Sequence, residues 1–90
     1  MRQRMTQERA ETIAIGGLAF VAGRDDEIGR FLQLSGMDAA ALRAGAADPD
    51  VLRAVLDFLL TDDALVTGFC EEQKLDARDL HMAHRVLAGS

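Results

Sequence analysis

Two stretches of this chain are apolar around most of a helix, and a single domain of 90 residues has little interior in which to bury both. Every position from Ile13 to Ala22 is apolar or glycine. In the second stretch, Val51 to Leu60, apolar side chains at about 100° per residue cover an arc of roughly 200°. A helix that is apolar all round is normally buried. The first question about the fold is therefore what covers these two helices.

Two interpretations of these stretches remain open. In the first, the helix that contains Val55 is the central strut, and the other helices wrap around it. In the second, the Gly16-Gly17 pair allows the backbone of the earlier helix to approach a second chain closely. The second interpretation predicts an interaction surface on the two helices, made of Ile13, Gly17, Phe20, Val51, Val55, Asp57 and Phe58.

Asp57 is the single polar residue in the run from Val55 to Leu60. With Asp50 and Arg53 it forms the one polar face of its helix. It either keeps this face in contact with water or anchors a cationic residue of a partner.

The residues that separate the apolar runs predict an all-α fold, a compact bundle of five to six short helices with short connections. No alternating pattern typical of a strand is found. Thr6 is expected to cap a first helix that ends near Gly23, since glycine commonly ends helices. Asp25 or Asp26 is expected to cap a second helix that ends at Ser35-Gly36.

Four further helices follow from the same signals. Asp38 is expected to cap a short third helix, and Asp48-Pro49 is a strong start for the fourth. Thr61 is expected to cap the fifth, and Asp76 the sixth, where Asp79 three residues on approximates a capping box. We therefore predict a flexible basic tail at residues 1–5 and one helical domain at residues 6–88.

The formal net charge of −5 opposes binding to nucleic acids and to anionic membranes. The longest charge-free apolar stretch, Thr12 to Gly23, is shorter than the about 20 residues that span a bilayer. Arg2 and Arg4 before it are typical of a signal peptide, but Glu8 and Glu11 are not, and no convincing cleavage site follows. We expect this stretch to be the first helix of a cytoplasmic domain that does not enter a membrane.

Cys70 is the one cysteine, which suits a reducing compartment. It flanks an apolar face, and its neighbours Glu71 and Glu72 oppose formation of a thiolate. We expect a partly buried cysteine of the core rather than a nucleophile.

His81 and His84 lie one helical turn apart, a spacing that metal ligands can have. Arg78 and Arg85 lie beside His81, and no third ligand is apparent. No catalytic or nucleotide-binding motif is present. We therefore expect no enzyme activity, no metal and no cofactor, and the sequence identifies no small-molecule substrate.

The segment Leu34-Ser35-Gly36-Met37-Asp38 resembles the glycine turn of a DNA-binding helix-turn-helix. A recognition helix needs several polar side chains for bases and phosphates, and the helix after this turn offers only Arg43. Weak nucleic-acid binding through Arg24, Arg30, Arg43 and Arg53 is the alternative function.

The chain from Arg30 to Phe69 also carries a series of short motifs. They are Arg30-Phe31-Leu32, Leu34-Ser35-Gly36, Leu42-Arg43, Ala47-Asp48-Pro49, Val55-Leu56-Asp57-Phe58-Leu59-Leu60 and Asp62-Asp63-Ala64-Leu65. In these motifs the chain resembles a small bacterial family catalogued as domain of unknown function 3572. Leu18-Ala19-Phe20 extends the resemblance toward the start. Asp63 and Val51 depart mildly from the family, in which Glu and Phe are usual at these places.

The resemblance implies an α-helical domain that occurs by itself in small cytoplasmic proteins, with no assigned activity and no catalytic residues. It also implies a link to signalling, through members encoded beside a two-component response regulator. We expect a small protein-interaction or regulatory module. Its partner is expected to be another protein or a second copy of this chain.

Overall fold

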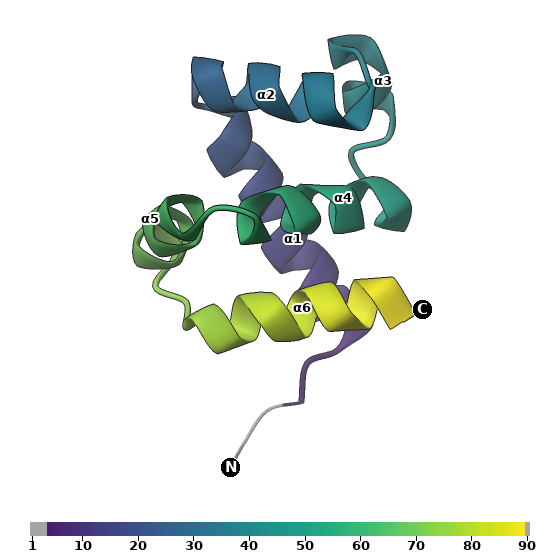
Figure 1. Ribbon diagram of the computed structural model, residues 1–90. Helices are drawn as coiled ribbons and strands as arrows, with labels where there is room; N and C mark the ends of the chain where they lie inside the picture. Colours follow the sequence, from purple (N-terminus) through teal and green to yellow (C-terminus); the bar gives the residue numbers. More distant parts are fainter. Residues whose placement is uncertain (1–3, 90) are drawn as a thin grey trace.

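The computed structural model describes residues 4–89, and this part of the chain is built from helices without any strand. The predicted all-α bundle is confirmed (Figure 1). The six helices are α1 (Gln7–Ala22), α2 (Asp25–Ser35), α3 (Ala39–Ala44), α4 (Pro49–Leu60), α5 (Asp63–Gln73) and α6 (Ala77–Gly89).

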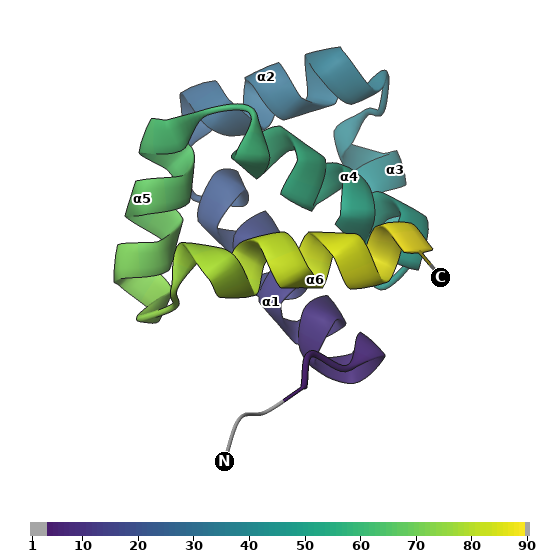
Figure 2. The same cartoon turned by 60° about the horizontal axis from the view of Figure 1, so that its bottom comes forward.

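Helices α1, α4 and α6 form the centre of the bundle. In Figure 1, α4 and α6 lie one above the other, and both cross α1, which runs behind them. Helix α5 joins the end of α4 to the start of α6 at one side. Helix α2 packs on α1 and α4, and the short α3 follows it at the opposite side from α5 (Figure 2). The arrangement leaves α4 with neighbours on several sides.

The core confirms that α4 is the central strut. Four of its side chains are almost fully buried, and no other helix contributes as many to this group. The largest fully buried side chains are Phe69, Leu52, Leu56, Leu59, Leu80, Val21 and Val55. Two aromatic pairs tie the outer helices to this centre in edge-to-face geometry, which ring quadrupoles favour. Phe20 meets Phe69 at 5.6 Å between ring centroids. Phe31 meets Phe58 at 5.5 Å.

Gly17 lies where α1 packs against α4. A Cβ atom at this position would lie 2.9 Å from Cδ1 of Leu59 and 3.5 Å from Cγ1 of Val55. A side chain at this position would therefore require either Leu59 or α1 itself to shift. The close backbone approach predicted for the Gly16-Gly17 pair is real, but Gly17 uses it against α4 of the same chain.

Most of the predicted helix starts are confirmed. Thr6 Oγ1 accepts a hydrogen bond from the Arg9 N–H at 3.0 Å, and Asp38 Oδ1 accepts one from the Ala41 N–H at 2.7 Å. The Asp48 side chain also accepts a hydrogen bond, at 2.9 Å, from the Asp50 N–H in the first turn of α4. These bonds satisfy backbone donors that the first turn of a helix leaves unpaired.

At α6, Asp76 accepts from the Arg78 N–H at 3.0 Å. Its own N–H donates to Asp79 at 3.4 Å, so the arrangement approximates the capping box as predicted.

Two predicted caps are wrong by one residue. Helix α2 begins at Asp25, with Arg24 as the capping residue and no side-chain cap. Asp25 and Asp26 instead lie in the first turn, where their charges favour the helix dipole. At α5 the cap is Asp62, whereas the Thr61 hydroxyl donates back to the Phe58 carbonyl and ends α4. At α5 two adjacent residues, Thr61 and Asp62, can both cap a helix, and the second one does so.

Two residues of the predicted tail, Arg4 and Met5, lie in the described part of the chain. Met5 is only 8% exposed and packs in the core. Arg4 is exposed. Residues 1–3 of the predicted tail lie outside the described residues. At the other end, α6 continues to Gly89, one residue past the predicted end of the domain.

Candidate functional site

Five of the seven residues of the predicted interaction surface are buried within the chain. They are Ile13, Gly17 and Phe20 of α1 and Val55 and Phe58 of α4. The physical reason is that α1 and α4 pack on each other, and α2, α5 and α6 pack on other parts of these two helices. Much of the apolar surface that the sequence pattern shows is therefore covered by helices of the same chain.

The other two predicted interaction residues are partly accessible. Val51 is half-buried, and its Cγ2 methyl lies 2.9 Å from the place of a Cβ on Gly45, so it packs under the α3–α4 turn. Asp57 has a side chain that is 52% exposed. Of the predicted set, Asp57 is the residue that reaches solvent most freely.

The accessible apolar surface lies elsewhere. Among the described residues, two large apolar side chains are exposed: Ile15 on α1 at 49% and Leu34 on α2 at 72%. Leu34 lines an open groove of about 250 Å³ between α2 and α4. We refer to it as the α2–α4 groove, and its lining residues are Phe31, Leu34, Ser35, Ala54, Asp57, Phe58 and Thr61.

The groove follows from the side chains that the two helices bring together. Phe31 and Phe58 are buried and meet edge to face, so the two rings join the helices in the core. Ala54 and Ser35 are small, which leaves space between the helices beside the rings. Arg30 places its guanidinium 5.4 Å from the Phe58 ring centroid, a cation–π distance that helps to hold α2 against α4.

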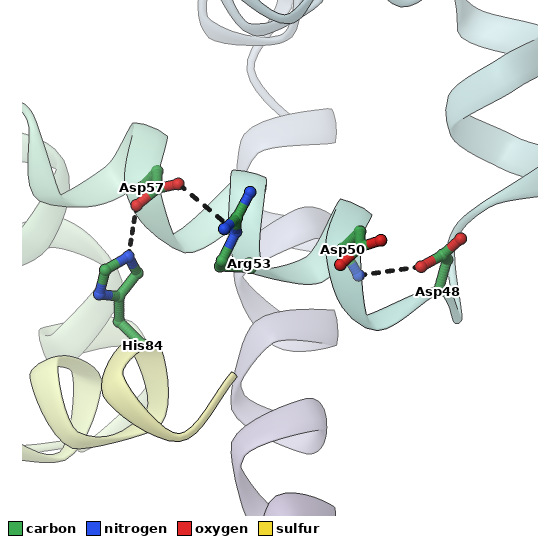
Figure 3. A network of polar contacts seen from close by, with 5 residues as sticks. All are labelled: Asp48, Asp50, Arg53, Asp57 and His84. Carbon is green, nitrogen blue, oxygen red and sulfur yellow. Dashed lines mark hydrogen bonds and ion pairs between the residues drawn. The ribbon is translucent and has the colours of Figure 1, made fainter. Parts of the chain in front are cut away.

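Asp57 connects the groove to a network of polar contacts, drawn in Figure 3. Its Oδ1 accepts a hydrogen bond from Nε2 of His84 on α6. Its Oδ2 lies 4.0 Å from Nε of Arg53, one turn earlier on α4. Ion pairs this exposed stabilise a protein by only about 0–1 kcal/mol. The network orients the Asp57 carboxylate at the edge of the groove.

Sequence reasoning missed Leu34 as a functional candidate because it considered the residue only as part of the glycine turn that ends the second helix. The structure places it in the last turn of α2, which ends at Ser35. A signal was present, since Leu34 follows Phe31 by three residues and therefore lies on the flank of the apolar face. The end of an amphipathic stripe is where an apolar side chain most easily extends past the core.

Cys70 is buried, as expected for a cysteine of the core. Burial raises the pKa of its thiol, and the carboxylates of Asp76 and Asp79 raise that pKa further. His81 is exposed, and Nε2 of His84 is hydrogen-bonded to the Asp57 carboxylate. No group of three or more His, Cys, Asp or Glu side chains in residues 4–89 is arranged to hold a metal ion.

Three of the four arginines of the nucleic-acid alternative contact other side chains of the protein itself. Arg24 lies over the Phe20 ring at 4.3 Å, Arg30 is 3.5 Å from Glu27, and Arg53 lies beside Asp57. Helix α3, in the position of a recognition helix, has only six residues. This geometry gives the nucleic-acid alternative no added support.

A second hollow, of about 300 Å³, lies between α1, α2 and α3. Apart from Arg43 it is lined by apolar side chains, and it presents no acidic group. None of its large apolar side chains is among the exposed ones. We therefore regard the α2–α4 groove as the stronger candidate site.

Comparison with known proteins adds one finding. The profile of a family described as "Protein of unknown function (DUF3572)" matches residues 7–90, which is nearly the whole chain. No curated protein and no solved structure matches. None of the helices within residues 4–89 combines the length and apolar character that crossing a membrane requires.

Proposed function

We propose that this chain, which belongs to the family of proteins of unknown function DUF3572, is a protein-binding module. Its α2–α4 groove receives an apolar side chain of a partner helix. The observation that carries this proposal is Leu34, a large apolar side chain that is 72% exposed beside an apolar groove. The cost of leaving such a side chain in water is offset when a partner covers it.

The size and shape of the groove support this function. Sites for small molecules usually enclose about 300–1,000 Å³. The α2–α4 groove is smaller, at about 250 Å³, and lies open between two helices. A groove between helices is a common site for an amphipathic helix, which inserts side chains spaced three or four residues apart.

The proposed role is binding, without catalysis and without a cofactor. Its support is chemical: burial and the carboxylates of Asp76 and Asp79 disfavour the thiolate of Cys70. The expectation of a cytoplasmic regulatory module, linked to signalling, remains part of the proposal.

Affinity capture from native lysate tests this function with two matched variants. Leu34→Asp places a charge beside the groove, and Ile15→Asp places the same charge at the other exposed apolar residue. We expect a partner that is retained by the wild type and by Ile15→Asp but is reduced at least about tenfold by Leu34→Asp, since a hot-spot contact is worth about 2 kcal/mol or more.

Circular dichroism of both variants provides the control for folding. If the two variants retain every captured protein equally, the groove is not the binding surface. If the purified wild type dimerises and Leu34→Asp is a monomer by light scattering, the partner is a second copy of this chain.

A further inference from the structure

One end of the α2–α4 groove is acidic. Asp57 lines it, and its side chain is 52% exposed. The chain leaves the groove at Thr61 and continues directly with Asp62 and Asp63. Two residues of chain span at most about 7 Å, so these carboxylates stay close to the end of the groove. Asp63 is exposed, whereas Asp62 is half-buried and caps α5.

The cations near the groove pair with only part of this end. Arg30 is 3.5 Å from Glu27 and lies over the Phe58 ring, so its charge is already paired on the α2 side. Arg53 is 4.0 Å from Asp57, which also contacts His84. Within residues 4–89, no ion pair involves the exposed Asp63.

We infer that the partner helix is cationic: it inserts an apolar residue beside Leu34 and places a lysine or arginine about one turn away, against Asp57 and Asp63. This inference rests on the proposed function of the groove. Opposite charges around an apolar contact set the orientation of a bound helix and accelerate association. The net charge of −5 on the whole chain favours the same class of partner.

Two synthetic peptides test the sign of the partner's charge. Both form amphipathic helices of about five turns with the same leucine face; one carries lysines on its polar face, and the other carries glutamates. Binding is measured by fluorescence anisotropy. We expect the lysine peptide to bind at least about tenfold more tightly than the glutamate peptide, and Leu34→Asp to remove its binding.

Matched variants separate the groove from the overall charge. Asp57→Asn with Asp63→Asn removes two charges at the groove, and Glu71→Gln with Glu72→Gln removes two charges from the last turn of α5. We expect the first pair to weaken binding of the lysine peptide about three- to tenfold, since two partly exposed ion pairs are lost. The second pair should change the dissociation constant less than about twofold.

The outcomes distinguish this inference from the proposed function. If both peptides bind equally and Leu34→Asp removes both, the groove binds helices without preference for charge, so the inference is wrong and the proposed function stands. If the Glu71 and Glu72 variant weakens binding as much as the groove variant, the attraction is general and the inference is again wrong. If Leu34→Asp leaves binding of the lysine peptide unchanged, both the inference and the proposed function fail.

Discussion

At the scale of one residue, the surroundings of Cys70 oppose the ionisation of its thiol. Its side chain packs in the core. Burial, Asp76 and Asp79 all raise the pKa of the thiol. A thiolate is the reactive form of cysteine, so each of these causes lowers reactivity.

The raised pKa predicts how stability depends on pH. In the unfolded chain the thiol loses its proton near its ordinary value of 9.0, before the folded protein does. The stability contributed by the protonated thiol is therefore complete below that pH and is lost as pH rises toward the folded pKa. We expect the free energy of unfolding of the wild type to fall more steeply above pH 9 than that of Cys70→Ala.

Urea titrations of both proteins across this pH range provide the measurement. Alkylation by iodoacetamide at pH 7 is an independent check, and it should be slower in the folded protein than in urea. Equal pH dependence in the two proteins, together with fast alkylation of the folded chain, would contradict this account of Cys70.

At the scale of helices, the contact between α1 and α4 depends on a residue without a side chain. Gly17 leaves no room for a Cβ because Leu59 occupies the space. Gly29, within α2, has no atom within 4 Å of the place of its Cβ. The two glycines therefore separate the effect of packing from the effect of helix propensity.

The matched pair predicts opposite changes in stability. Gly17→Ala should lower the free energy of unfolding by about 1–3 kcal/mol, because Leu59 or the whole of α1 must shift. Gly29→Ala should raise it by about 0.5–1 kcal/mol, because alanine favours a helix and meets no neighbour. Urea unfolding measures both. A stabilising Gly17→Ala would mean that α1 does not pack on α4 as closely as described.

The helices could be predicted from sequence because each is marked by local chemistry. Glycine ends α2, and proline begins α4, in positions where their backbone properties require them. The sequence could not show that Asp62 rather than Thr61 caps α5, because either side chain can accept the capping hydrogen bond. Tertiary packing decides this choice, since the Thr61 hydroxyl donates to the α4 carbonyl of Phe58 instead.

The candidate site was only partly predictable for a related reason. Asp57 was singled out because one polar residue interrupts an apolar run. The pattern shows how much apolar surface α1 and α4 carry, but not which helices cover it. That information depends on how α2, α5 and α6 pack, which creates the groove and leaves Leu34 exposed.

At the scale of the whole molecule, the helices pack compactly around α4. Its radius of gyration is 12.3 Å, close to the about 12 Å expected of a compact domain of this length. All six helices of residues 4–89 contribute side chains to the core, and α3 contributes Leu42. Exposed apolar side chains are therefore confined to a few places, of which Leu34 is the most accessible in residues 4–89.

The central claim is that Leu34 lies in a binding surface, and site-specific photocrosslinking in cells of the source organism tests it most directly. A photoreactive phenylalanine analogue replaces Leu34 in one protein and Ile15 in another, so that both probes occupy exposed apolar positions. We predict a defined crosslink to another protein chain from position 34 and none from position 15. Equal crosslinking from both positions, or none from position 34, would contradict the assignment of the α2–α4 groove as the binding site.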